Sequence, residues 1–272
     1  MAQAVEIATQ LVQLTVTTTD NSTVFNSLEF SLQNEADLLY VLTEYQGPGG
    51  ADVGIDVVEI NSSASVVAVG RTGIPSSLRY IDAMPGLDAL TITATDLIQG
   101  SATSFDLNFG QASGRQQILS SAYGIVTTPT DNVGAIILDT TLSAIGGIAY
   151  TLILTGDLSE PESFLLVDDT RVVSTHAKLG IVHAAESLPE SDVYIAPFGG
   201  DIFVGTKLAD MLYRTSRDLI FADGLYNITV TTEGSESILV GPITVDLSRG
   251  SITSVLIRES VNGDDPYGLE VL

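Results

Sequence analysis

Polar and apolar residues alternate along most of this chain with the two-residue period of a β-strand. The alternation is clear over residues 89–94, 105–109 and 226–231. Successive side chains of a strand point to opposite faces, so these segments predict strands with one buried and one exposed face. Turn-forming pairs such as Asp223-Gly224 separate them. The pattern predicts an all-β protein, with short helical turns near 116–121 and 207–213 only.

Three segments of the chain recur about one hundred residues later. The pairs are 78–83 with 179–184, 121–127 with 225–230, and 146–154 with 249–257. The aligned residues Leu78 and Leu179 lie 101 positions apart, and Tyr123 and Tyr226 lie 103 apart. Nearly equal spacing over separate segments indicates one fold used twice. We therefore predict two similar β-sandwiches, over 77–172 and 176–272.

The region before residue 76 matches only the end of such a unit. Segments 37–42 and 54–60 resemble the strands at 149–154 and 163–168, with nearly constant offsets of 110 and 109 residues. Strands that match only part of a repeat predict an incomplete unit. We expect a partial or small β unit over 17–75, preceded by an N-terminal β arm over 1–16.

The arm carries apolar residues of both strand parities. One set is Val5, Ile7 and Leu11, and the other is Val12, Leu14 and Val16. The change of parity between residues 11 and 12 predicts a β-bulge or a strand break. An incomplete sandwich exposes an unpaired edge, which the arm of a neighbouring copy can fill. The alternative is that residues 5–32 supply the missing strands within their own chain.

The repeated unit has recognisable phrases. It opens with Leu179-Gly-Ile-Val-His-Ala-Ala185 and continues through Gly224-Leu-Tyr-Asn-Ile-Thr-Val230, and Phe164-Leu-Leu-Val-Asp-Asp169 joins the two units. These phrases resemble the DUF4397 family over 77–272, and more weakly over 25–75. The resemblance implies tandem immunoglobulin-like β-sandwiches in a secreted or surface-anchored prokaryotic protein. It implies no reaction, because the shared phrases are strand and turn signatures.

The composition narrows the class of partner. The chain has 34 acidic and 10 basic residues and a formal net charge of −24, which disfavours nucleic acid and anionic membranes. The 44% of hydrophobic residues indicates a folded chain with an acidic surface. Cysteine is absent, which excludes disulfides and thiol chemistry. No apolar run is long enough to span a bilayer, so we expect no membrane insertion.

Two features of the sequence are candidates for catalysis or metal binding. His183 ends a predicted strand, where Asp82 stands in the first unit, and we expect it to hydrogen-bond the next loop. Acidic pairs at what we take to be corresponding ends of the two units are weak calcium candidates, with solvated acidic turns as the alternative. These pairs are Asp168 with Asp169, and Asp264 with Asp265. Without a recognisable triad, metal cluster or phosphate loop, we expect no enzyme and no obligatory cofactor.

These observations favour a structural protein outside the cell. We expect a self-assembling surface filament, pilus-like or sheath subunit, whose copies join by β-strand donation through the N-terminal arm. The alternative is a surface adhesin, or a carbohydrate- or ligand-binding module, that acts as a monomer with glycans as partners. The chain has no tryptophan and only 6% aromatic residues, which weighs against a sugar-stacking surface.

Overall fold

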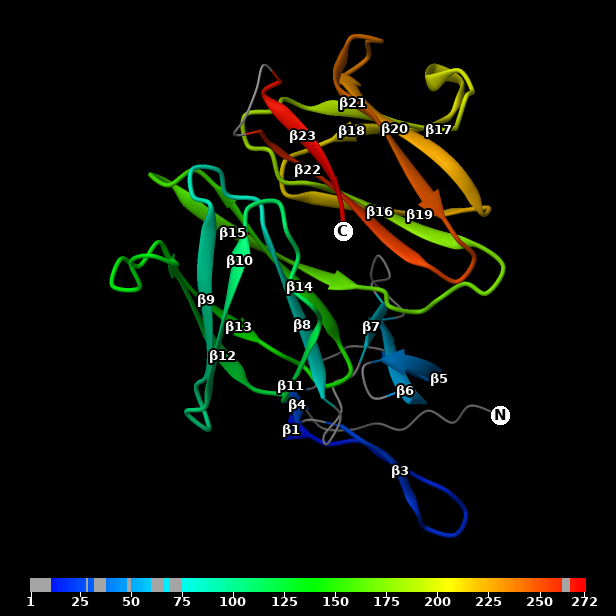
Figure 1. Cartoon of the computed structure of the whole chain (residues 1–272). Coiled ribbons are helices and arrows are strands. Elements are labelled where there is room, and N and C mark those ends of the chain that lie inside the picture. The colour runs from blue at the N-terminus through cyan, green and yellow to red at the C-terminus, as the bar shows by residue number, and fades with distance from the viewer. Residues whose placement is uncertain are drawn as a thin grey trace. The chain divides into compact units, whose positions relative to one another are not determined.

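The computed structural model describes residues 11–27, 29–31, 38–47, 50–59, 66–68, 75–260 and 265–272. In this part of the chain every regular element is a strand, except the 3₁₀ turn η1 (Ile202–Val204) (Figure 1). The predicted all-β class is confirmed. The chain divides into two compact units. The N-terminal unit comprises 1–77, 117–121 and 143–149, and the larger unit comprises 78–116, 122–142 and 150–272.

The described part of the N-terminal unit contains three small antiparallel sheets. They are β1 (Leu11–Val12) with β4 (Phe30–Ser31), β2 (Thr15–Thr17) with β3 (Thr23–Asn26), and the meander β5 (Leu38–Gly47), β6 (Gly50–Glu59) and β7 (Val66–Ala68). Among the side chains that the structure describes in these sheets, the buried hydrophobic ones are Phe25 and Ile55.

Strands β8 to β15 form two four-stranded sheets, in the orders β10-β9-β12-β13 and β11-β8-β14-β15. Their bounds are β8 (Ser76–Asp82), β9 (Ala89–Asp96), β10 (Ala102–Asn108), β11 (Gln116–Ile118), β12 (Ala122–Pro129), β13 (Leu138–Ser143), β14 (Ala149–Gly156) and β15 (Pro161–Asp168). The rings of Tyr80 on β8 and Phe105 on β10 lie 4.9 Å apart between centroids, so the two sheets face each other. We call these strands the first sandwich.

Strands β16 to β23 repeat this arrangement, in the orders β18-β17-β20-β21 and β19-β16-β22-β23. Their bounds are β16 (Ala177–His183), β17 (Ser191–Pro197), β18 (Thr206–Met211), β19 (Thr215–Phe221), β20 (Gly224–Thr232), β21 (Ile238–Leu247), β22 (Ile252–Glu259) and β23 (Tyr267–Val271). We call them the second sandwich. Each strand order recurs eight strands later, which agrees with the repeat predicted from the sequence. The domain boundaries themselves stay predictions.

The predicted helical turns are wrong, because 116–118 and 206–211 form the strands β11 and β18. The order of strands also bears on the expected immunoglobulin-like character. In an immunoglobulin constant domain the first strand pairs with the second. Here β16 lies between β19 and β22, antiparallel to the first and parallel to the second. The resemblance to an immunoglobulin sandwich therefore stays a prediction.

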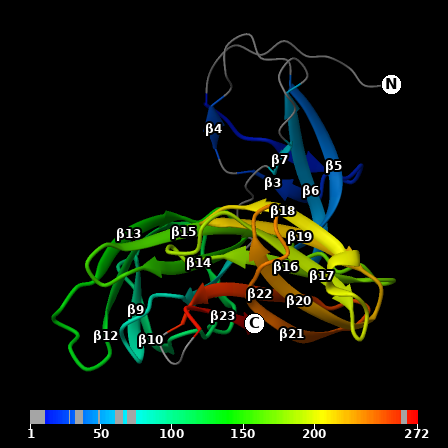
Figure 2. The same ribbon diagram turned by 90° about the horizontal axis from the view of Figure 1, so that it is seen from above.

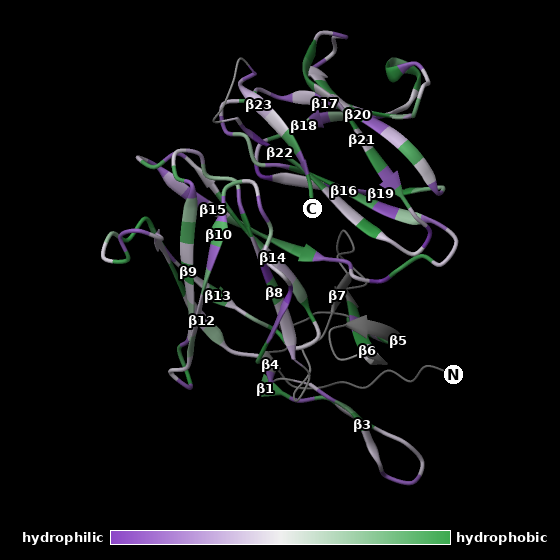
Figure 3. Ribbon diagram, viewed as in Figure 1, coloured by the Kyte–Doolittle hydropathy of each residue, from purple (hydrophilic) through white to green (hydrophobic). Residues whose placement is uncertain are grey.

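The alternation of the sequence appears directly in the burial of the strands. On β9, Leu90, Ile92 and Ala94 are buried, whereas the threonines between them are half-exposed, and Figure 3 shows the alternation as bands along the strand. The second sandwich has one core to which both sheets contribute. Its buried members include Leu179, Ile181, Val193, Ile195, Ile228, Val230, Val245, Leu247, Val255 and Ile257.

The two sandwiches pack against each other through sheet faces (Figure 2). Every residue of β14 is buried, and so is nearly every residue of β16, on both faces of the strand. A second apolar cluster joins the sandwiches: Ile81, Ala83, Ile153, Phe164, Val182, Ala184 and Leu256. Strands buried on both faces need apolar residues of both parities, which explains the continuous apolar runs of β14 and β16.

Candidate functional site

The described part of the N-terminal arm pairs within its own chain. Leu11 and Val12 on β1 face Ser31 and Phe30 on β4, and Val16 on β2 faces Phe25 on β3. The strand break expected between residues 11 and 12 lies two positions later, at residues 13 and 14. Val5 and Ile7 fall outside the described residues. Pairing of the arm with another copy stays a prediction.

Burial divides the arm residues by parity. Val12, Leu14 and Val16 are half-buried, whereas the side chain of Leu11 is 66% exposed. The break is held by Ser27, whose backbone N–H donates to the Leu14 carbonyl and whose hydroxyl accepts from the Leu14 N–H, each at 2.8 Å. In the described part of the arm, the second parity set is therefore more buried than Leu11.

Strand β5 presents an open edge in the N-terminal unit. Among the residues that the structure describes, its ten residues pair only with β6. Leu39, Val41 and Leu42 on this strand are exposed, Leu42 to 59%. A long, apolar, unpaired edge is a template for pairing with another strand. Sequence reasoning anticipated an open edge in this unit but not which strand forms it.

The calcium candidates Asp168 and Asp169 lie together but bind basic side chains. Asp168 accepts hydrogen bonds from Arg115 at 2.5 Å and from the Thr151 hydroxyl at 2.6 Å. Asp169 accepts from Arg171 at 2.7 Å and from Lys178 at 2.8 Å. Partial burial acts to raise the pKa of Asp169, but these hydrogen bonds outweigh it and hold the pKa well below its ordinary value. Calcium here would compete with four established partners.

The second calcium pair does not occupy the corresponding place. Asp168 is the last residue of β15, whereas Asp265 precedes β23, the equivalent strand. The sequence expectation of corresponding ends was therefore wrong, because a short acidic pair carries no strand register. Asp265 is exposed, and Asp264 lies outside the described residues.

Three other carboxylates come together that the sequence did not indicate. Oxygens of Glu190, Asp210 and Glu233, all exposed, lie within 4.8 Å of one another. Desolvation, followed by the negative charges of Glu233 and Asp210, raises the pKa of Glu190. These residues come from three loops or strand ends of the second sandwich, so only the tertiary fold joins them. The grouping adds local repulsion.

A cavity of about 210 Å³ lies between the two sandwiches, beside Asp168. Charged residues of both signs line it: Arg79, Arg115, Lys178, Asp168, Asp169 and Asp218. Arg79 spans the contact, because its Nε donates to Thr151 at 2.8 Å and its Nη2 donates to Ser254 of β22 at 3.3 Å. Three of the ten basic residues of the chain therefore gather here.

Polar contacts also join the sandwiches beside Glu162. The Tyr213 hydroxyl donates to Glu162 at 3.0 Å, and Arg214 donates to the same carboxylate at 3.3 Å. The Thr155 hydroxyl donates to the Ala184 carbonyl at 2.7 Å. Burial raises the pKa of Tyr213 to about 12, so the phenol stays a donor at neutral pH. The apolar contact is thus flanked by polar contacts that fix its register.

Equivalent buried positions of the two repeats carry His183 and Asp82, at the ends of β16 and β8. Neither ring nitrogen of His183 has a hydrogen-bond partner in the described part of the chain, so the expected bond to the next loop is wrong. Burial lowers the pKa of His183 to about 4 and raises the pKa of Asp82 to about 7. His183 is therefore neutral at pH 7, whereas Asp82 is about half protonated there.

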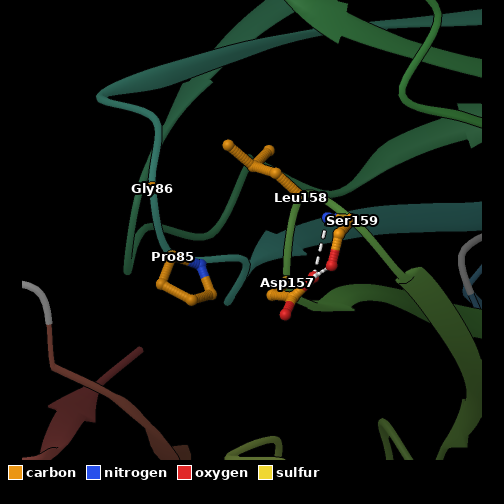
Figure 4. Close-up of a pocket in the computed structure, with 5 residues that line it drawn as sticks. All are labelled: Pro85, Gly86, Asp157, Leu158 and Ser159. Atoms are coloured by element: carbon orange, nitrogen blue, oxygen red, sulfur yellow. Dashed lines mark hydrogen bonds between the residues drawn. The ribbon is translucent and has the colours of Figure 1, made fainter.

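A shallow depression lies between the turns after β8 and β14 (Figure 4). Pro85, Gly86 and Leu158 supply its apolar part. Asp157 accepts hydrogen bonds from the backbone and the hydroxyl of Ser159, which lower its pKa. The carboxylate thus closes its own turn. Nothing around it in the described residues pairs a nucleophile with a base, the minimum for catalysis of acyl transfer.

Residues 76–194 match the family model described as "Domain of unknown function (DUF4397)". This part of the chain is thus similar to the DUF4397 family. The matched range covers the first sandwich and continues to the middle of β17 in the second. The resemblance predicted from the strand phrases is confirmed. No curated protein is significantly similar to this chain. The structure contains no helix, among the residues described, that is long and apolar enough to cross a membrane.

The chain also resembles several solved structures weakly. The TIE protein of Bacillus anthracis aligns over 92% of this chain and 57% of its own, with 12% identity and a TM-score of 0.24. A leucine-rich repeat protein of Bacteroides thetaiotaomicron shares 14% identity over 66% of this chain and 25% of its own (TM-score 0.19). A Bacteroides ovatus protein described as an adhesin shares 7% sequence identity with this chain. The alignment covers 72% of this chain and 92% of the adhesin, with a TM-score of 0.19. The chain spans little over half the length of the TIE protein, and scores this low carry no functional argument.

Proposed function

We propose that this chain is an extracellular or cell-surface structural protein whose copies join through the N-terminal unit. The observation that carries the proposal is the open edge of β5, which presents ten strand residues with exposed Leu39, Val41 and Leu42. The backbone groups of such an edge gain partners when a strand from another copy aligns with them. The donated strand in this proposal is the N-terminal arm, residues 1–16.

The arm is suited to exchange because its pairs within the chain are short. The β1–β4 pair joins two residues of each strand, and the β2–β3 pair joins three with an irregular register. Few hydrogen bonds are lost when such short ladders open, and equivalent ones form with the neighbour. The two sandwiches support the structural part of the proposal, because a buried apolar cluster joins their sheets.

Negative-stain electron microscopy tests the proposal. The intact chain is expected to form regular filaments, whereas a chain lacking residues 1–16 and the variant Leu42→Lys are expected to stay single particles. A lysine on an edge strand blocks pairing by charge. Val204→Lys is the matched control, because Val204 is 80% exposed on η1 and lies outside the N-terminal unit. Single particles from the intact chain, or filaments from all variants, would contradict the proposal.

The alternative function is a monomeric adhesin or ligand-binding module. One observation favours it, the charged cavity between the sandwiches. A protein of this kind binds a small partner through preformed polar groups, and needs no contact between copies. Intact single particles that bind a ligand at this cavity would favour the alternative.

A further inference from the structure

We propose that the cavity between the two sandwiches binds a small zwitterion, a molecule that carries one carboxylate and one ammonium group. The inference is independent of assembly through the N-terminal arm. It rests on two oppositely charged side chains, Arg79 and Asp218, that line the same cavity without pairing.

Arg79 is a guanidinium without a carboxylate partner. In the described part of the chain its side chain donates to the hydroxyls of Thr151 and Ser254 and forms no ion pair. The carboxylate whose charge acts on Arg79 is Asp168, which is already hydrogen-bonded by Arg115 and Thr151. Burial lowers the pKa of Arg79, the charge of Asp168 opposes this change, and the charge of Arg115 adds to it. A planar carboxylate is the natural partner of such a guanidinium.

Asp218 on β19 is a carboxylate without a basic partner. Its side chain is exposed and forms no hydrogen bond or ion pair with any described residue, and it lines the cavity with Lys178 and Asp168. Desolvation and then the charge of Asp168 raise its pKa, while Lys178 opposes the rise. An ammonium group would supply both the missing donor and the missing positive charge. The cavity thus lacks one anion and one cation at the same time.

The charge of the cavity wall and of the whole chain favours a zwitterion over a free anion. The six charged residues of the cavity wall, three basic and three acidic, sum to zero. A free anion meets the repulsion of a chain with net charge −24, and a zwitterion does not. A volume of about 210 Å³ is below the range of drug-sized pockets and suits a molecule of amino-acid size.

Gly180 keeps room for the carboxylate of Asp218. A Cβ at this position would lie 2.9 Å from Asp218 Oδ1 and 3.6 Å from Ser254 Oγ. The backbone of Gly180 is an ordinary strand that pairs with Asp218 across the sheet, so alanine is compatible with its conformation. Gly180→Ala therefore displaces the Asp218 carboxylate without changing any charge. This variant separates the geometry of the cavity from its electrostatics.

Isothermal titration calorimetry on the full chain tests the proposal, with glycine, β-alanine and γ-aminobutyrate as probes of increasing charge separation. Acetate and methylammonium are the single-charge controls. At least one zwitterion is expected to bind, and Arg79→Gln, Asp218→Asn and Gly180→Ala are each expected to weaken it by roughly ten- to a hundredfold. Circular dichroism and the midpoint of thermal unfolding show that each variant is folded.

Two control variants match these changes in charge. Arg217→Gln alters the residue next to Asp218 on the opposite face of β19, and Asp246→Asn alters an exposed residue of β21. Both are expected to bind as the wild type does. The proposal is overturned if no zwitterion binds at millimolar concentrations, if acetate or methylammonium binds equally well, or if the cavity variants bind unchanged.

Discussion

Replacing Asp82 with asparagine should change how the stability of the chain depends on pH. Asp82 ends β8 with its side chain wholly buried. Its Oδ1 accepts a hydrogen bond from the Met84 N–H at 3.0 Å, and its Oδ2 has no partner in the described part of the chain. Burial raises its pKa from 3.8 to about 7, although the Met84 hydrogen bond opposes the rise.

The sign follows from the two pKa values. Between 3.8 and about 7 the unfolded chain releases a proton that the folded chain keeps. The stability contributed by neutral Asp82 is therefore fully present below the lower value and is lost as the pH rises through the upper one. The loss over the whole window is about 4 kcal/mol. Asparagine cannot ionise, so Asp82→Asn lacks this loss.

Urea unfolding of the wild type and Asp82→Asn, followed by tyrosine fluorescence across this pH window, measures the effect. The difference between the two free energies of unfolding cancels all other titrating groups. We expect it to shift in favour of the variant by about 4 kcal/mol from the acidic to the neutral end. Asp88→Asn, at an exposed residue of the following turn, is the control. A difference that stays constant with pH would refute the reasoning.

Three further predictions concern the two sandwiches. The wild type should lose about 3 kcal/mol of stability as the pH falls from 6.5 to about 4, because the buried imidazole resists protonation. His183→Gln should remove this loss. Urea unfolding across this pH range measures it, and an equal loss in both chains would count against the prediction. Tyr226→Phe should cost about 0.5–1.5 kcal/mol, because the phenol donates to the Ala222 carbonyl at 3.2 Å; an unchanged urea midpoint would speak against this. Leu256→Ala should cost about 2–5 kcal/mol by opening a cavity at the sandwich contact. The half-exposed Leu165 provides its control, Leu165→Ala, and an equal cost for both in thermal unfolding would contradict the assigned contact.

The repeat was predictable because strand patterns are local. The nearly equal offsets of Leu78 from Leu179 and of Tyr123 from Tyr226 correspond to equivalent strands, β8 with β16 and β12 with β20. The Tyr226 hydroxyl also donates to the backbone carbonyl four residues upstream, as in a tyrosine corner. Local alternation thus carried most of the fold.

The contact between the sandwiches was less predictable from sequence. Its one signal was the presence of apolar residues of both parities in β14 and β16, which indicates burial on two faces. The charged cavity gave no such signal, because Arg79, Lys178 and Asp218 are far apart in the chain and meet only through tertiary packing. The missing partner of His183 was likewise invisible, since strand position alone does not determine what surrounds a buried ring.

Amide hydrogen exchange along β5 tests the central claim of strand donation most directly. In an edge strand every second N–H points away from its one neighbour and exchanges with water. The account predicts that these amides of Leu38–Gly47 are protected in the assembled intact chain and unprotected in the chain lacking residues 1–16. Equal and rapid exchange of these amides in both chains would contradict it.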